Sequence, residues 1–135
     1  MPSFSETSQD RLDTCHTDLI VLMEEVVKVF DCSIICGERT KEDQSEAFIS
    51  KRSQTDWPDS KHNKEPSMAV DVAPYPIDWN DRERFTLFAG YVLGIAKTLK
   101  TQGRISHEVR WGGDWNRNWI VSDNRFDDLV HFELC

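Results

Sequence analysis

The chain of 135 residues is long enough to bury a hydrophobic core and suits one compact domain. Its formal net charge of −8 disfavours a nucleic-acid partner, because phosphate binding needs a basic face, and it also disfavours adhesion to an anionic membrane. No apolar run approaches the length of a membrane span, and the polar N-terminus has no signal-peptide core, so we expect no membrane insertion.

The four cysteines do not form a zinc-binding pattern. Cys32 and Cys36 are four residues apart, which is not the CxxC spacing, and no second pair follows them. We expect Cys15, Cys32, Cys36 and Cys135 to be buried or free thiols in a reducing compartment.

The first predicted helix runs from Thr17, its expected N-cap, to about Phe30. Apolar residues recur there at helical spacing, and Asp18 lies on the opposite, polar arc. The next segment, CSIIC at residues 32–36, predicts a short buried strand.

A second helix follows after a turn. Thr40 and Asp43 resemble a capping box, and we expect this helix to extend to about Lys51. The polar segment 52–65 then predicts a loop that leads into a short strand around Asp71.

The third predicted helix shows the strongest periodicity. Asn80 is its expected N-cap and Gly103 its expected end, and the apolar residues between them keep a helical register. Pro74 and Pro76 separate this helix from the preceding strand, because proline interrupts regular structure.

The C-terminal third predicts short strands. The segments HEVRW (107–111), WIVS (119–122) and LVHFEL (129–134) have strand composition, and turns rich in Gly, Asp and Asn separate them. Because helices and strands do not alternate as βαβ repeats, the order of elements predicts an α+β fold with an antiparallel sheet.

Histidines and carboxylates offer the chemical signal, since the sequence contains no nucleotide-binding loop and no serine-hydrolase elbow. Two of the four histidines have no distinctive context. His16 precedes a helix and His107 begins a strand, so we expect surface or capping roles for both.

His62 and His131 differ because carboxylates accompany them: Asp71 follows His62, and Asp128 precedes His131 by three residues. A catalytic zinc site needs three protein ligands, an open position for water, and a carboxylate base that is not a ligand. His62, Asp71 and His131 can supply the ligands, and Asp128 the base. The alternative is that all four are hydrogen-bonded surface side chains.

The two-residue period of a strand divides the last predicted strand into two faces. One face is apolar and can pack on the helices, whereas the other would line a polar cleft and pairs a histidine with a carboxylate that can orient it. The apolar face holds Val130, Phe132 and Leu134, and the other face holds Leu129, His131 and Glu133.

Two motifs, SKH…SMAVD and DDLVHFEL, resemble those of metallopeptidases of the D-Ala-D-Ala carboxypeptidase/VanY type. The likeness is closest to phage endolysins that act as L-alanyl-D-glutamate peptidases, which carry SxHxxGxAxD followed by [ED]xxH. The matching positions are Ser60, His62, Ala69, Asp71, Asp128 and His131.

Two further segments carry this likeness, which extends over residues 12–134. GERTKEDQ, with Arg39, Thr40 and Gln44, looks like the family's G-x-R-[ST]-x-x-x-Q element. WGGDW at residues 111–115 resembles the cleft segment of the endolysins, although core packing of its tryptophans is an equal alternative.

The chain departs from the family motif between His62 and Asp71. The connecting loop is two residues longer, and EPS replaces the glycine. Loop closure costs little per added residue, so we expect both side chains to reach one metal ion.

The resemblance implies an α+β fold of the DD-peptidase/Hedgehog type, with a small antiparallel sheet and helices packed on one side. It also implies a Zn²⁺ cofactor and a role for each motif residue. These roles are metal binding by His62, Asp71 and His131, catalysis by Asp128, and substrate binding by Arg39 and Ser60.

The implied function is hydrolysis of the L-Ala–D-Glu bond in the peptidoglycan stem peptide during host-cell lysis. We expect one zinc peptidase domain over residues 1–135, without a separate cell-wall-binding domain, and a monomer. Since no signal peptide is present, the enzyme would reach the wall from the host cytoplasm with the help of another protein. A D-Ala-D-Ala carboxypeptidase or dipeptidase, and a non-catalytic zinc module that binds wall peptides, remain alternatives.

Overall fold

The computed structural model describes residues 2–135, which form helices, strands and one 3₁₀ turn. No helix among these residues is both long enough and apolar enough to cross a membrane. The elements in chain order are α1 (Glu6–Leu12), α2 (Thr17–Val27), β1 (Cys32–Cys36), α3 (Lys41–Ile49), η1 (Lys61–Asn63), β2 (Ala69–Pro74), α4 (Arg82–Thr101), β3 (Val109–Gly112) and β4 (Asp128–Leu134).

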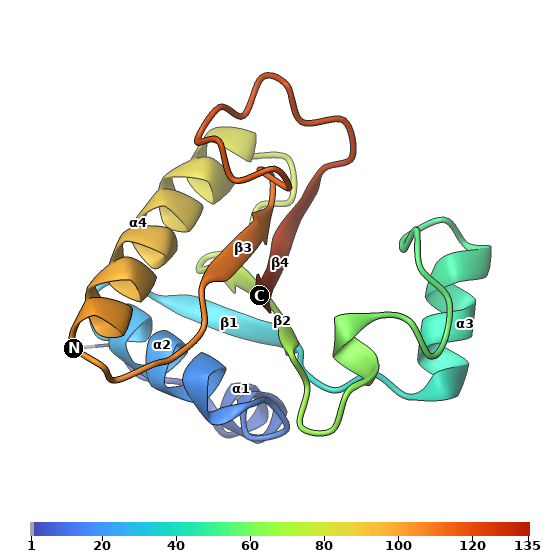
Figure 1. The fold of residues 1–135 in the computed structure, drawn as a ribbon, viewed down its shortest axis with the longest axis horizontal. Coiled ribbons are helices and arrows are strands. Elements are labelled where there is room, and N and C mark those ends of the chain that lie inside the picture. Colours follow the sequence, from blue (N-terminus) through green and yellow to red (C-terminus); the bar gives the residue numbers. More distant parts are fainter. Residues whose placement is uncertain (1) are drawn as a thin grey trace.

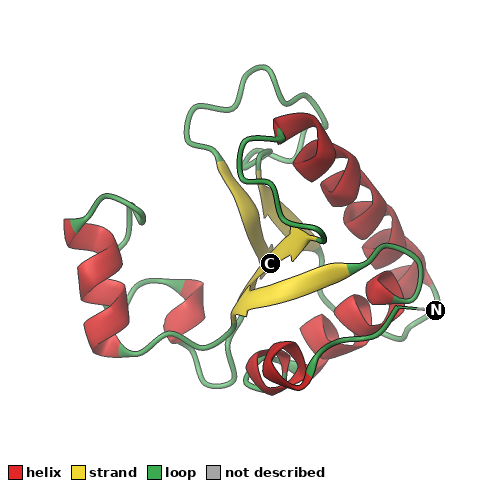
Figure 2. Ribbon diagram, turned by 180° about the vertical axis from the view of Figure 1, so that it is seen from behind, coloured by secondary structure: helices red, strands yellow, loops and turns green. Residues whose placement is uncertain are grey.

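The four strands form one antiparallel sheet in the order β1-β2-β4-β3. Helices α1, α2 and α4 gather along the sheet, whereas α3 stands apart from them at the end of a long excursion of the chain (Figure 1). The view from behind shows the same separation (Figure 2). The predicted α+β fold, with a small antiparallel sheet and helices packed on one side, is confirmed.

Strand β2 crosses the middle of the sheet and is buried along its whole length. Val70 and Val72 belong to the hydrophobic core together with Phe88 of α4 and Phe132 of β4. Asp71 lies between the two valines and lines a cleft on the other face of the sheet, as the alternation of a strand predicts.

Strand β4 departs from strict alternation. Trp111 pairs with Phe132, but the next residue, Gly112, pairs with Asp128, so β4 carries extra residues at a bulge. As a result Leu129 packs against the core and Val130 lines the cleft, and the predicted faces of these two residues were wrong.

After the bulge the predicted alternation holds. Phe132 and Leu134 lie in the core, whereas His131 and Glu133 line the cleft. His131 and Glu133 are thus on the predicted face.

Two helix starts differ by one residue from the prediction. Asp81, and not Asn80, is the N-cap of α4, because its carboxylate accepts a hydrogen bond from the backbone N–H of Arg84 at 3.1 Å. His16, and not Thr17, caps α2 through its side chain.

Helix α1 was not predicted, because its segment is mostly polar. Ser5 followed by Glu6 is nevertheless a pattern typical of a helix start. The expected strand at residues 119–122 was wrong. Trp119 has a φ of 65°, a left-handed backbone that a strand excludes, and residues 113–127 form a loop between β3 and β4.

Candidate metal centre and active site

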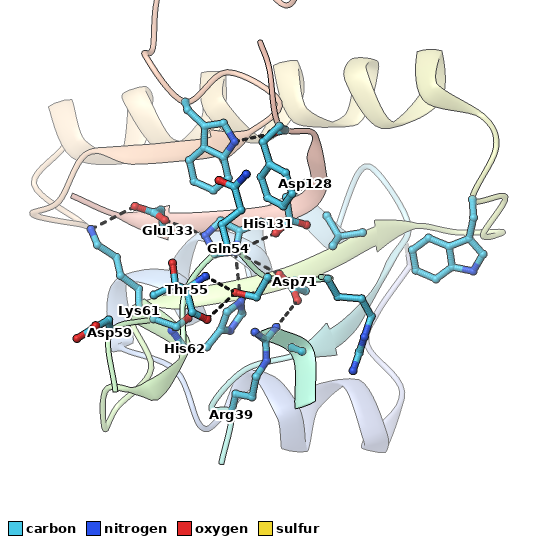
Figure 3. A pocket seen from close by; sticks show the side chains of 18 residues that line it. Arg39, Gln54, Thr55, Asp59, Lys61, His62, Asp71, Asp128, His131 and Glu133 are labelled. Carbon is cyan, nitrogen blue, oxygen red and sulfur yellow. Dashed lines mark hydrogen bonds and ion pairs between the residues drawn. The ribbon is translucent and has the colours of Figure 1, made fainter. Parts of the chain in front are cut away.

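Three elements bring His62, Asp71 and His131 together in a cleft on the sheet face away from the core (Figure 3). His62 comes from η1, and Asp71 and His131 are paired neighbours on β2 and β4. The Nε2 atom of His62 lies 3.2 Å from Asp71 Oδ1 and 3.2 Å from His131 Nδ1. The third side of this triangle, from His131 Nδ1 to Asp71 Oδ1, measures 3.4 Å.

Local hydrogen bonds fix the ring of His62. Ser60 caps η1, since its hydroxyl oxygen accepts from the His62 backbone N–H. The side-chain oxygen of Asn63 in turn accepts from the backbone N–H of Ser60. The His62 Nδ1 atom lies 2.8 Å from the carbonyl oxygen of Gly37. A carbonyl oxygen only accepts, so Nδ1 carries a proton, and Nε2 is the nitrogen that faces the triangle and would bind a metal.

Glu133 does the same for His131. Its Oε1 lies 2.8 Å from His131 Nε2, so the carboxylate holds a proton on Nε2, and Nδ1 is the nitrogen that faces Asp71. Arg110 and Lys61 hold the carboxylate of Glu133 in turn, at 2.7 Å and 3.3 Å. The partnership expected between Glu133 and His131 is present.

The triangle has the dimensions of one face of a tetrahedral zinc site. Zinc bonds of about 2.0–2.1 Å to nitrogen and oxygen in tetrahedral geometry place the ligand atoms about 3.3–3.4 Å apart. The measured separations of 3.2, 3.2 and 3.4 Å fit this value. Two neutral imidazoles and one carboxylate are also a donor set that zinc accepts, and three ligands leave the fourth position free.

The charges of the aspartate and the two histidines shift one another's pKa values. Burial opposes ionisation of Asp71, but the adjacent histidines outweigh it and lower the pKa of this carboxyl far below its usual range. Burial also disfavours protonated His62, yet the charge of Asp71 raises its pKa. Since a metal needs neutral imidazoles, its binding would release protons from the histidines.

The sequence profile of the family described as phage L-alanyl-D-glutamate peptidase matches residues 2–135. The chain belongs to this family. Among solved structures, the L-Ala D-Glu endopeptidase ChiX of Serratia marcescens matches with a TM-score of 0.73. That match covers 99% of this chain and 91% of the other at 24% sequence identity, so it shows a shared fold. No curated protein sequence matches the chain.

Asp128 stands beside the triangle, and its carboxylate lies within 4.8 Å of ligand atoms of Asp71 and His131. Asp128 begins β4 at the bulge, where it pairs with Gly112, and its Oδ2 lies 3.9 Å from His131 Nδ1. Burial raises the pKa of Asp128, and the negative charge of Asp71 adds to the rise. A carboxylate with a raised pKa next to a candidate metal site suits proton transfer.

Arg39 reaches the site from the turn before α3. Its two terminal nitrogens donate to Gln44 Oε1 at 2.9 Å and to Asp71 Oδ2 at 3.3 Å. Gln44 is completely buried, and its amide nitrogen donates to Ser53 Oγ at 3.1 Å in the cleft wall. Sequence reasoning included Gln44 in the motif but gave it no role, because the two groups that its amide nitrogen binds, on Ser53 and Thr55, lie in a loop that the motif does not include.

The cleft has a volume of about 600 Å³ and lies between the sheet and the segment from α3 to η1. Ser60 lines this cleft as well as capping η1, and its contact to substrate stays a prediction. The two tryptophans of WGGDW separate: Trp111 is buried in the core, whereas Trp115 lines the cleft with its ring centroid 5.3 Å from that of His131.

Cys36 is a neighbour of the site that sequence reasoning treated as an ordinary thiol. It pairs with Asp71 across β1 and β2, and its sulfur lies within 4.8 Å of ligand atoms of His62 and Asp71. The only signal in the sequence was its place one residue before the GERT segment.

Proposed function

We propose that this chain is a zinc-dependent peptidoglycan hydrolase that cuts the L-Ala–D-Glu bond of the stem peptide during lysis of the host cell. The observation that carries the proposal is the His62–Asp71–His131 triangle with the carboxylate of Asp128 next to it. Family membership supports the choice of bond, and the shared core of the described elements supports one catalytic domain over residues 1–135.

His62, Asp71 and His131 would hold the zinc ion. When bound, zinc supplies a Lewis acid that activates water and polarises the scissile carbonyl. A purely structural site has four protein ligands and needs no base, so three ligands with Asp128 beside them favour a catalytic role over a module that only binds peptides.

Asp128 would accept the proton of the attacking water and deliver it to the amine that leaves. Its raised pKa makes it a better proton acceptor than an ordinary aspartate, and its place on β4 keeps it beside the ligands. Arg39 would face the carbonyl oxygen of the substrate, since a fixed guanidinium stabilises the negative charge that develops there. Ser60 would contact the peptide from the cleft wall.

The test is digestion of purified peptidoglycan and of synthetic stem peptides, with the products identified by mass spectrometry. The proposal predicts new L-Ala carboxyl termini and new D-Glu amino termini, which depend on added zinc after chelation. Release of D-Ala alone would instead indicate a D-Ala-D-Ala carboxypeptidase, and products that a chelator does not affect would contradict the zinc mechanism.

A further inference from the structure

The proposed substrate must present a negative charge beside the bond that is cut. A glutamate residue within a peptide uses its amino group and one of its two carboxyl groups for the chain, so the other carboxyl group stays free. At neutral pH this group is ionised. An enzyme that selects D-Glu at this position therefore needs a cation in its cleft.

Three Lys or Arg side chains line the cleft among the described residues: Arg39, Arg52 and Lys61. Two of them already have partners within the site. Arg39 donates to Gln44 and Asp71, and Lys61 pairs with Glu133 at 3.3 Å and also donates to the carbonyl oxygen of Leu134. Engaging either with a substrate carboxylate would remove charge from the groups that hold the metal ligands.

Arg52 has a different environment. Its side chain is 65% exposed, and its ion pair with Glu46 is 3.7 Å long, with the glutamate side chain 74% exposed. Its Nε donates to the hydroxyl of Ser50 at 3.0 Å. An exposed ion pair of this length contributes little to stability, so it exchanges readily for another carboxylate.

The backbone at the end of α3 brings Arg52 to the cleft. Lys51 has a φ of 65°, which reverses the chain after the helix, and the backbone N–H of Ser53 then donates to the carbonyl oxygen of Ala47 at 3.0 Å. Arg52 lies between these two residues and lines the cleft together with Ser53 and Ala47.

We propose that Arg52 binds the free carboxylate of the D-glutamate residue and thereby selects this substrate over its amidated form. The inference rests on the proposed function. The two arginines then have different roles. Arg39, which donates to Asp71, faces the carbonyl group of the bond that is cut, whereas Arg52 binds the free carboxylate of the D-glutamate residue.

The experiment compares two synthetic peptides that differ only at this group, one with D-Glu and one with the same carboxyl amidated. Kinetic constants are measured for the zinc-loaded wild type, Arg52→Gln, Arg52→Lys and the control Arg104→Gln. Arg104 is also exposed and paired with a glutamate, Glu25, but it does not line the cleft.

For wild type we expect amidation to raise KM about tenfold, the lower end for hydrogen bonds to charged groups, because Arg52 is largely exposed. Arg52→Gln should show the raised KM on the acidic peptide, with kcat nearly unchanged, and no further loss on the amidated one. Arg52→Lys should recover part of the discrimination, and Arg104→Gln should match wild type.

The outcomes separate the two proposals. If wild type cleaves both peptides and Arg52→Gln keeps the wild-type ratio of KM values, or if wild type does not discriminate, the role of Arg52 is wrong and the peptidase function stands. If wild type cleaves neither peptide, the proposed function fails and this inference fails with it. Melting temperatures close to that of wild type would confirm that the Arg52 variants are folded.

Discussion

Two clusters each bring two histidines and one aspartate close together. In the cleft, ring nitrogens of His62 and His131 lie 3.2–3.4 Å from Asp71 Oδ1 and from each other. At the start of α2, ligand atoms of His16, Asp18 and His107 lie within 4.8 Å of one another. In both, a carboxylate oxygen lies close to imidazole nitrogens. The two clusters differ in the hydrogen-bond partners of their imidazole nitrogens.

In the second cluster a ring nitrogen and a carboxylate oxygen accept hydrogen bonds from backbone N–H groups. His16 Nδ1 accepts from the Asp18 backbone N–H as the cap of α2. Asp18 Oδ2 accepts from the backbone N–H groups of Ser106 and His107 and from His107 Nδ1, at 3.0, 3.1 and 2.7 Å. These bonds tie α2 to the segment before β3, so this cluster stabilises the fold.

In the cleft one nitrogen of each ring donates away from the centre, to the Gly37 carbonyl or to Glu133, and the other nitrogen faces Asp71. In the second cluster Asp18 already engages the Nδ1 atom of both histidines, through its backbone N–H and its carboxylate. In the cleft, Gly37 and Glu133 fix each ring from outside, as the partners of metal-binding histidines do, so this cluster is the candidate metal site. The number of histidines and carboxylates alone does not make this distinction.

The largest effect should follow from His131→Ala. It removes one of the three proposed ligands, so we expect loss of stoichiometric zinc and of peptide cleavage. Metal analysis after gel filtration and a peptide assay measure both. The matched control is His107→Ala, which should retain zinc and activity; loss of zinc in the control instead would reverse the roles of the two clusters.

Asp128→Asn should separate binding from chemistry. The amide cannot accept the proton of water, so we expect kcat to fall by about 10²–10⁴ while the zinc content stays at one per chain. Steady-state kinetics with parallel metal analysis would show this. A kcat near that of wild type would rule out Asp128 as the base.

Glu133→Gln should weaken the site without destroying it. The amide oxygen still accepts from His131, but the charge that increases the basicity of the ring is lost, and we expect zinc affinity to fall by about 10–100-fold. Competition with a chromogenic chelator measures this affinity. Glu108→Gln, which removes a surface carboxylate paired with Lys97 and Lys100, should leave the affinity unchanged.

Asp18→Asn tests the structural cluster and should have the smallest effect. Burial opposes ionisation of Asp18, but hydrogen bonds from His107 and Ser106 outweigh it and lower its pKa. A lowered folded-state pKa gives stability that is present above the unfolded value, near 3.9, and is lost as the pH falls through the folded value.

We therefore expect Asp18→Asn to lower the free energy of unfolding by about 1 kcal/mol at neutral pH. The difference from wild type should shrink as the pH falls below about 4. Urea unfolding at several pH values would show both effects. A difference that does not change with pH would mean that the ionised carboxylate does not stabilise the fold.

The alternation of β2 and the end of β4 could be predicted from sequence because each strand has one apolar face that packs on helices. Val70, Val72 and Phe132 define that face, and Asp71 and His131 follow on the other. The two-residue period of a strand is therefore sufficient to place two of the proposed ligands in the cleft.

The rest depends on contacts between distant segments. The bulge that moves Leu129 into the core arises from the pairing of β4 with β3, which the sequence of β4 does not reveal. Asp18 was expected on a polar arc, yet it is buried because Ser106 and His107, which are distant in the sequence, fold against it.

The contrast within the site is similar. Motif likeness indicated Arg39 as a substrate contact, but only the structure shows that its guanidinium is held between Gln44 and Asp71. Arg52 and Cys36 belong to no motif. Only the tertiary structure shows that Arg52 lines the cleft and that Cys36 pairs with Asp71.

The most direct test of the metal centre is a crystal structure of the zinc-loaded protein with an anomalous difference map at the zinc edge. The account predicts one strong peak bonded to His62 Nε2, Asp71 Oδ1 and His131 Nδ1, with the fourth position open to the cleft. A peak at His16, Asp18 and His107, or zinc closed off by the sulfur of Cys36, would contradict it.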